Sequence, residues 1–198
     1  MANIKNINQL DFGKVYSYAD YLKWRLKERI ELIKGHIFAM SPAPSSNHQK
    51  ISFGLGLKLG VFFEKKECEV YAAPFDVRLP KKISNSDENT HTVVQPDLCV
   101  ICDLDKIDKR GCKGAPDLVV EILSPGNTKK EMRTKFDLYQ ESGVREYWIV
   151  YPKEKWVFIY VLDKKNHYQL SQHFIEAEKL KSRIFPKLKI SLDDIFTE

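Results

Sequence analysis

Two stretches of the chain are apolar at nearly every position, yet each carries one carboxylate near its middle. The first reads Val-Val-Gln-Pro-Asp-Leu-Cys-Val-Ile around Asp97, and the second reads Asp-Leu-Val-Val-Glu-Ile-Leu around Glu121. A strand that is apolar on both faces normally lies inside a sheet, so both segments are predicted to be buried strands. Burying an ionised carboxylate costs several kcal/mol unless a lysine, an arginine or a metal ion compensates it. The chain either carries this cost twice or holds a cation between the two strands.

Three segments have the apolar periodicity of helices: 17–29, 48–65 and 129–142. Ser17 can cap the first helix, while Thr128 and Glu131 fit a capping box for the third, which Gly143 can end. The middle helix has one apolar stripe, formed by Ile51, Leu55, Leu59 and Phe62. It also contains Gly54, Gly56 and Gly60, each of which costs about 1 kcal/mol relative to alanine. Close packing against a neighbour would explain why the helix tolerates them.

Alternating apolar and polar positions predict the remaining strands. These segments are 31–40, turned at Lys34-Gly35, then 69–79, 146–150, 156–162 and 167–174. Polar connections are expected over 81–90 and 103–113. No internal repeat or linker divides the chain, so residues 1–198 are predicted to form a single domain. The order of elements is that of a mixed α/β (α+β) sheet flanked by helices.

Composition and charge narrow the class of protein only slightly. Of the 198 residues, 43% are hydrophobic and 30% are charged, which is ordinary for a globular protein with a real core. The net charge of +5 leans mildly towards polyanionic partners. No apolar run approaches the roughly 20 residues that cross a bilayer, and the first residues lack the layout of a signal peptide. We therefore expect a cytoplasmic protein with no membrane partner.

The four cysteines do not predict a zinc site. Cys99 and Cys102 have a zinc-like spacing, but no second Cys or His pair accompanies them, and alternation directs them to opposite faces of a strand. We expect the cysteines to be small buried hydrophobic residues.

The two lone carboxylates suit a divalent cation. Carboxylates on neighbouring strands can lie about 5 Å apart, which fits one hard ion whose remaining positions are filled by waters and substrate oxygens. Asp117 is a rival to Asp97, but it is on the same strand as Glu121 and roughly 13 Å away from it, so the two cannot share a metal. Lys135, on the helix that follows the Glu121 strand, is the candidate for orienting a nucleophile or neutralising developing charge.

Several further stretches carry a family resemblance. They are Ile30 to Gly35, Met40-Ser41-Pro42 with His48, Val94 to Asp97, Pro116 to Pro125, Lys135 to Tyr139, and Gly143 to Val150. In this combination, the chain from about Tyr18 to Leu162 resembles the Uma-type restriction endonuclease family of the PD-(D/E)XK nuclease superfamily. The resemblance implies a restriction-endonuclease-like fold, with a mixed central β-sheet flanked by helices. It also implies hydrolysis of DNA phosphodiester bonds that depends on Mg²⁺ or Mn²⁺.

The resemblance assigns roles to individual residues. Asp97 and Glu121 match the two acids of the motif, and the Ile122 backbone carbonyl would assist them in binding the metal. The lysine usually found two residues after the second acid is replaced by Leu123, so the resemblance moves that role to Lys135. Glu31 matches an acid in the N-terminal part that could reach the metal. His48 matches a recurrent histidine of the second helix.

Three hypotheses remain open from the sequence. The first is a metal-dependent DNA endonuclease. The second is a nuclease-like fold that only binds nucleic acid or associates with itself, which the missing lysine at position 123 mildly favours. The third is a structural salt-bridge network without a metal. Exposed strand edges after Trp156 favour a homodimer.

Overall fold

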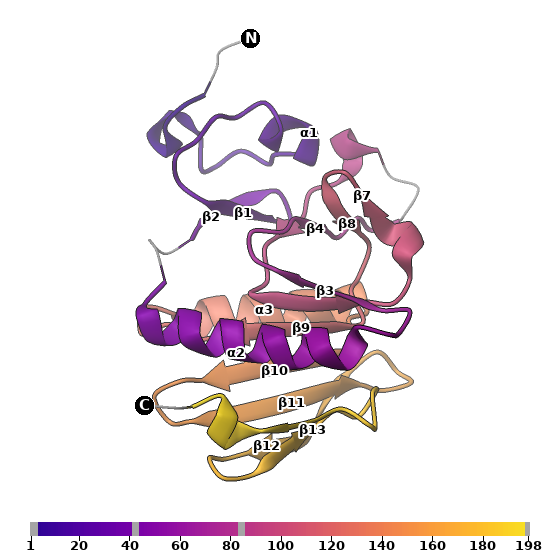
Figure 1. Cartoon of the computed structure of the whole chain (residues 1–198). Coiled ribbons are helices and arrows are strands. Elements are labelled where there is room, and N and C mark those ends of the chain that lie inside the picture. The colour runs from indigo at the N-terminus through magenta and orange to yellow at the C-terminus, as the bar shows by residue number, and fades with distance from the viewer. Residues whose placement is uncertain (1–3, 41–43, 83–85, 197–198) are drawn as a thin grey trace.

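Two six-stranded sheets form the framework of the computed structural model, which describes residues 4–40, 44–82 and 86–196. The sheet that carries Glu121 has the order β12-β11-β10-β9-β6-β3 (Figure 1). Its strands are β3 (Glu69–Ala72), β6 (Leu98–Ile101), β9 (Leu118–Ile122), β10 (Glu146–Tyr151), β11 (Trp156–Leu162) and β12 (Tyr168–Phe174). We call it the central sheet.

The second sheet consists of shorter strands in the order β2-β1-β5-β4-β8-β7. They are β1 (Ile30–Ile33), β2 (His36–Ala39), β4 (Val77–Arg78), β5 (Val93–Val94), β7 (Ile107–Asp108) and β8 (Gly111–Lys113). A separate hairpin joins β13 (Lys179–Lys181) to β14 (Lys189–Ser191). The α-helices are α1 (Tyr18–Tyr21), α2 (Ser46–Phe63) and α3 (Lys129–Ser142).

The central sheet is mixed, as the sequence predicts. Strands β9 and β10 are parallel, while the other neighbouring pairs are antiparallel. Parallel neighbours need a crossover connection, and α3 supplies it between β9 and β10. In the β6–β9 pair, Leu98 lies opposite Val120. Continuing this register by one residue puts Asp97 beside Glu121.

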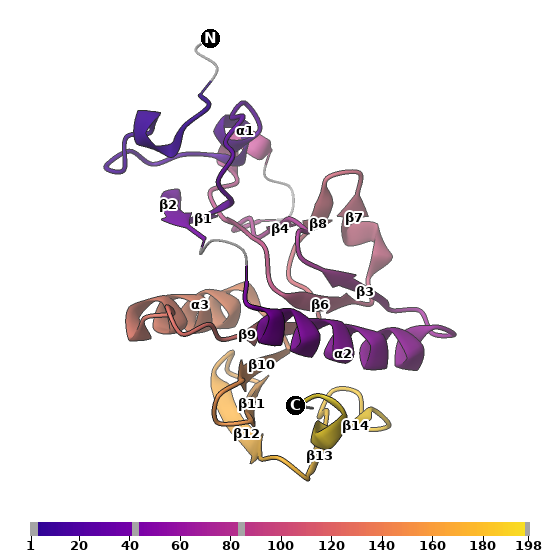
Figure 2. The same ribbon diagram turned by 60° about the vertical axis from the view of Figure 1, so that its left-hand side comes forward.

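Helices cover both faces of the central sheet (Figures 1 and 2). On one face, α2 and the β13–β14 hairpin enclose a core that includes Leu55, Val120 and Trp148. On the other face, α3 and the second sheet enclose a core that includes Val119 and Tyr139. Because alternate residues of β9 point to opposite faces, Glu121 points with Val119 towards α3.

The ends of α3 are those that the sequence predicts. Thr128 Oγ1 accepts from the Glu131 N–H at 3.1 Å, and Glu131 Oε2 accepts from the Thr128 N–H at 2.7 Å. Gly143 ends the helix with a φ of 84°, a left-handed conformation that glycine adopts without strain. These contacts set which residues of α3 face the sheet.

Several sequence predictions are wrong. The expected helix over 17–29 stops at Tyr21, because the Arg25 N–H donates to the Ile4 carbonyl rather than to a helical partner. The expected strand over 69–79 is broken by Pro74, which has no N–H for a ladder, so β3 and β4 belong to different sheets. The polar connection over 103–113 contains the β7–β8 hairpin.

Smaller differences concern the second helix, one loop and the C-terminal region. Phe63, rather than Phe62, completes the buried stripe of α2, while Phe62 is half-buried. The β13–β14 hairpin was not predicted. Part of the predicted loop over 81–90, residues 83–85, lies outside the described residues.

The cysteines divide into two pairs. Cys99 and Cys112 are buried thiols, as expected, but Cys68 and Cys102 form a disulfide. The prediction of four small buried hydrophobic residues is therefore wrong for the second pair, whose bond ties the segment after α2 to the end of β6. Among the described residues, none of the helices has the length and apolarity needed to span a bilayer.

A buried carboxylate fixes the C-terminal hairpin to the sheet. Glu146 is fully buried; its Oε1 accepts from Trp148 Nε1 at 2.6 Å, and its Oε2 accepts from the N–H groups of Arg183 and Ile184. Glu146→Ala should lower the free energy of unfolding by about 3 kcal/mol, because one buried and two partly buried donors lose their acceptor. Urea unfolding measures this loss. Glu176→Ala removes an exposed ion pair and should change stability by less than about 1 kcal/mol; equal losses in the two variants would contradict this account.

Candidate metal-assisted active site

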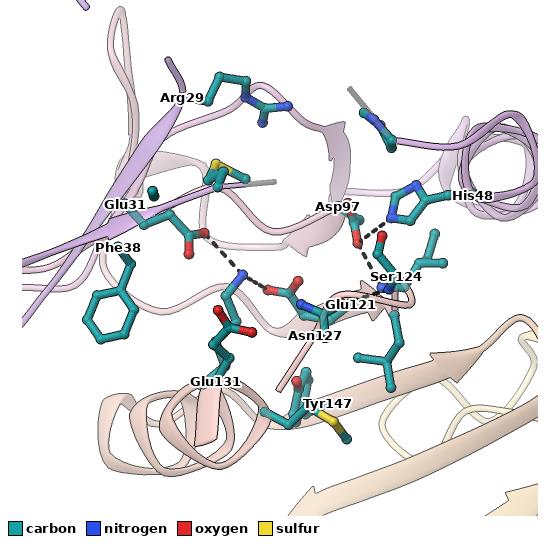
Figure 3. Close-up of a pocket in the computed structure, with 17 residues that line it drawn as sticks. Arg29, Glu31, Phe38, His48, Asp97, Glu121, Ser124, Asn127, Glu131 and Tyr147 are labelled. Carbon is teal, nitrogen blue, oxygen red and sulfur yellow. Dashed lines mark hydrogen bonds and ion pairs between the residues drawn. The ribbon is translucent and has the colours of Figure 1, made fainter. Parts of the chain in front are cut away.

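One pocket collects the side chains that the sequence singled out (Figure 3). It lies where β1, the first turn of α2, the end of β9 and the first half of α3 meet. Its lining includes all six predicted site residues: Glu31, His48, Asp97, Glu121, Ile122 and Lys135. Leu123, at the position where the related motif has lysine, also lines the pocket, and its N–H donates to the Val150 carbonyl.

Asp97 is held by the strand beside it and by α2. Its Oδ2 accepts from the Ile122 N–H at 2.7 Å and lies 3.3 Å from His48 Nε2. Its other oxygen, Oδ1, makes no hydrogen bond within the described residues. Asp97 is therefore oriented through one oxygen and leaves the other available to a ligand in the pocket.

Lys135 bridges two carboxylates from different sheets. Its Nζ lies 2.9 Å from Glu121 Oε1 and 3.1 Å from Glu31 Oε1, and Figure 3 shows these two acids pointing towards each other. The side chain of Lys135 is 20% exposed, so water screens these ion pairs only in part. This half-buried cation compensates the charge of Glu121 in part.

Tyr139 completes the surroundings of Glu121, and the sequence analysis gave it no role. Its hydroxyl donates to Glu121 Oε1 at 2.6 Å. Tyr139 follows Lys135 by four residues, so both occupy the same face of α3. This spacing is the signal that could have identified it.

The pKa values show how strongly these groups interact. Burial raises the pKa of Glu121 from 4.5 to about 7, although Lys135 acts to lower it. Burial acts to lower the pKa of Lys135, but the charges of Glu121 and Glu31 outweigh it and raise that pKa above its ordinary value. Burial also raises the pKa of Tyr139 well above its ordinary value, so its hydroxyl keeps its proton. The positive charge of Lys135 therefore compensates the buried carboxylate of Glu121 only in part.

Glu31 reaches the pocket from β1 and is held by the turn before β6. It is only 4% exposed, and its Oε1 also accepts from the Gln95 N–H at 2.9 Å. The Gln95 side chain in turn accepts two hydrogen bonds from the Arg29 guanidinium and donates one to Asp76. Arg29 lines the pocket, and Gln95 links it to Glu31.

His48 belongs to the first turn of α2. The Ser45 hydroxyl accepts from the His48 N–H and fixes where the helix begins. Burial acts to lower the pKa of His48, but the hydrogen bond and charge of Asp97 raise it overall, aided by the Ile122 carbonyl. Nδ1 is buried and has no hydrogen-bond partner among the described residues.

Two other acids, Asp117 and Glu131, have hydrogen-bond partners outside the cluster of Glu31, Glu121 and Lys135. Asp117, the rival considered from the sequence, accepts from the Cys102 N–H and pairs with Arg145 at the opposite end of β9. Glu131 lines the pocket, but it hydrogen-bonds within the capping box of α3.

The donor atoms fit a hard divalent cation. One oxygen each of Asp97, Glu121 and Glu31 has no hydrogen bond within the described residues, and the Ile122 carbonyl lies at the same pocket. Magnesium usually binds through one or two carboxylates together with water and substrate oxygens. Across the described part of the chain, no three His, Cys, Asp or Glu side chains form a ready-made metal group. Lys135 lies between Glu31 and Glu121, so the pair of acids nearest to sharing an ion is Asp97 and Glu121.

This fold, with a mixed sheet between helices and acids on adjacent strands, is shared with a solved structure. A structure of 20% sequence identity has the same fold, with a TM-score of 0.69 over 91% of this chain and 97% of the other. It is described as "Crystal structure of a putative nuclease belonging to DUF820" from Anabaena variabilis.

The family match extends over most of the chain. Residues 18–193 match the profile of the family Uma2, described as "Putative restriction endonuclease". The chain belongs to this family. It is also 30% identical over 122 residues to the uncharacterized protein slr1290 of Synechocystis, a match that spans 61% of this chain and 60% of that protein. Membership of this family supports a nuclease function.

Proposed function

We propose that the protein is a metal-dependent endonuclease that hydrolyses DNA phosphodiester bonds at the pocket of Asp97, Glu121 and Lys135. The observation that carries this proposal is the meeting of two lone strand carboxylates and a buried lysine beside a backbone carbonyl. Membership of the Uma2 family supports the reaction class. The oxygen-only donor set supports Mg²⁺ or Mn²⁺ as the cofactor.

The charge of the pocket supports the need for a metal. Four carboxylates line the pocket, those of Glu31, Asp97, Glu121 and Glu131, against the positive charges of Lys135 and of Arg29. A DNA phosphate would meet net negative charge there. The pKa of about 7 for Glu121 indicates that this acid is incompletely compensated. A divalent cation would offset the negative charge that repels a phosphate and would also compensate Glu121. Once bound, it would polarise a phosphoryl oxygen and stabilise the charge that develops on it.

The chain's own residues would position the reaction. Asp97 and Glu121 would bind the ion, with the Ile122 carbonyl and, after some movement, Glu31. His48 and the Ile122 N–H orient Asp97 through its Oδ2. Lys135, held by two carboxylates, has three N–H donors, so it can donate to an attacking water or to a phosphoryl oxygen. Tyr139 keeps Glu121 in place with its hydroxyl.

A plasmid-nicking assay tests the proposal. The purified protein should convert supercoiled plasmid to the open-circular form with Mg²⁺ or Mn²⁺ but not with excess EDTA. Asp97→Asn should lower the rate by about 100-fold, because the amide oxygen is a weaker ligand than a carboxylate. Asp105→Asn, an exposed residue away from the pocket, is the matched control. Activity that persists in EDTA, or in Asp97→Asn after the same purification, would contradict the proposal.

The ion pairs of Lys135 support a second candidate, a nuclease-like fold that binds nucleic acid without cutting it. In that case Lys135 serves only to stabilise Glu31 and Glu121, and the hydrophobic Leu123 fits the absence of catalysis. Calorimetric titration distinguishes the two. Binding of Mn²⁺ that Asp97→Asn weakens supports the enzyme, while no heat at millimolar Mn²⁺ supports the binding module.

A further inference from the structure

The outer face of α2 is apolar along three turns. Phe53, Leu57 and Val61 are 75%, 55% and 67% exposed, and they follow one another at intervals of four residues. The opposite side of the helix is fully used, since Ile51, Leu55, Leu59 and Phe63 pack against the central sheet. Figures 1 and 2 both show α2 on the outside of the molecule. The helix therefore has a second apolar face that its own chain does not cover, which we call the outer stripe.

Glycines lie beside the outer stripe, and packing within the chain does not require all of them. A Cβ built on Gly60 would meet nothing within 4 Å, and one on Gly54 would make an ordinary contact of 3.5 Å with Ile195. Gly56 is different, because its Cβ would lie 3.3 Å from Leu98. Close packing on the central sheet thus explains Gly56 but not Gly54 and Gly60. Small residues beside an apolar stripe allow another helix to approach closely.

We propose that the outer stripe binds a second copy of this chain through an antiparallel pairing of two α2 helices. The sequence of the helix is complementary to itself about Leu57. If a two-fold axis passes at Leu57, Phe53 lies opposite Val61 of the other copy and Gly54 lies opposite its Gly60. A two-fold interface requires such self-complementarity, since each residue must suit the partner that symmetry gives it.

The charges at the ends of the outer stripe follow the same symmetry. Lys50 is seven residues before Leu57 and Glu64 is seven residues after it, so each Lys50 lies opposite Glu64 of the other copy. Both residues are exposed. At 100° per residue, they lie within about 20° of Leu57 around the helix. Opposite charges at both ends favour this antiparallel register over a parallel one.

This interface differs from the one that the sequence suggested. Edge pairing after Trp156 was expected; among the described strands after that residue, β11 is paired on both sides, while β12 and the short strands β13 and β14 each have one unpaired edge. The outer stripe offers three exposed apolar side chains on a rigid helix, whereas the exposed apolar residue within β12 is Leu170. The pairing of α2 helices does not depend on the proposed function.

Sedimentation equilibrium tests whether the dimer exists and where its interface lies. The wild-type chain should be dimeric at micromolar concentration. Leu57→Glu should weaken dimerisation at least 100-fold, because two carboxylates would meet at the axis. Leu170→Glu, on the edge of β12, should leave it unchanged. Circular dichroism checks that both exposed substitutions leave the fold intact. A monomeric wild type, or a dimer weakened by Leu170→Glu and not by Leu57→Glu, would overturn the proposal.

Cross-linking and charge exchange test the register. Leu57→Cys should form a disulfide between copies under mild oxidation, since a residue on a two-fold axis faces itself, whereas Leu170→Cys should not. Glu64→Lys should weaken the dimer, and the added Lys50→Glu should restore it. Gly60→Ala should raise the melting temperature of the monomer but weaken the dimer. Failure of Leu57→Cys to cross-link, or of the charge exchange to restore binding, would refute the antiparallel register.

Discussion

Replacing Glu121 with glutamine is expected to lower the rate of plasmid nicking by about 1,000-fold and, in the same variant, to raise the stability of the metal-free protein at pH 8. The loss of rate follows from removing a charged metal ligand, since about 4 kcal/mol of transition-state stabilisation corresponds to this factor. The gain in stability follows from removing a buried charge that Lys135 compensates only in part. Tyr139 and Lys135 can still donate to the amide oxygen.

The effect on stability should depend on pH. The pKa of Glu121 is about 7 in the folded chain, above its ordinary value of 4.5. The folded state therefore binds the proton more tightly than the unfolded state. The stability contributed by this group is fully present below about pH 4.5 and is lost as the pH rises through about 7. Glu121→Gln should remove this part of the pH dependence, so its advantage should grow between pH 5 and pH 8.

Thermal unfolding in EDTA, together with the nicking assay, measures both effects. Glu141→Gln changes an exposed acid on α3 that pairs with Lys34, and it is the matched control. It should leave activity and the pH dependence of stability unchanged. A Glu121→Gln variant that nicks plasmid at the wild-type rate would remove this residue from the mechanism. A variant less stable than wild type at pH 8 would show that the ionised carboxylate stabilises the fold.

Replacing Lys135 with methionine is expected to impair both activity and folding. Glu31 and Glu121 would lose the cation that bridges them, and breaking a buried pair in this way costs about 3 kcal/mol or more. Methionine fills a similar volume, so packing should change little. The nicking rate should fall as well, because no other described lysine contacts Glu121.

The stability of Lys135→Met should recover partly in acid. Without the lysine, the pKa of Glu121 should rise further, and protonation at lower pH removes one of the two uncompensated charges. Urea unfolding in EDTA at pH 8 and pH 5.5 should therefore show a smaller loss at the lower pH. Lys130→Met, on an exposed part of α3, should cost less than about 0.5 kcal/mol. An equal loss at both pH values would contradict the charge explanation.

Local sequence signals predicted the elements that position the pocket. The uninterrupted apolar runs around Asp97 and Glu121 indicated buried strands, and the capping box with Gly143 set the limits of α3. Lys135 was placed on the helix that follows the Glu121 strand, and the family resemblance gave it the role of the missing lysine. These inferences succeeded because each depends on neighbours close in sequence.

Features that depend on distant contacts could not be predicted. The helix at Ser17 ends early because Arg25 bonds to Ile4, and the second sheet forms because Pro74 diverts the chain between β3 and β4. The disulfide between Cys68 and Cys102 requires the end of α2 to meet the end of β6. Pro74 is a local signal that the strand is interrupted, but nothing local predicts the Arg25–Ile4 contact or the disulfide.

In the pocket, too, contacts between residues far apart in the sequence were the ones that could not be predicted. The sequence alone had no geometric reason to bring Glu31 to Lys135, since 104 residues separate them and only the resemblance pointed to this acid. Tyr139 was overlooked although its spacing from Lys135 is regular, because a tyrosine in a helix is usually explained by packing. The links from Glu31 through Gln95 to Arg29 depend on a turn whose conformation the sequence does not reveal.

The metal-assisted site is the central claim, and a crystal soaked in Mn²⁺ tests it most directly. An anomalous difference map should show one ion that contacts carboxylate oxygens of both Asp97 and Glu121 and the carbonyl of Ile122, with Lys135 Nζ still beside Glu121. A fully soaked crystal of protein that nicks plasmid, with no anomalous peak in this pocket, would contradict the account.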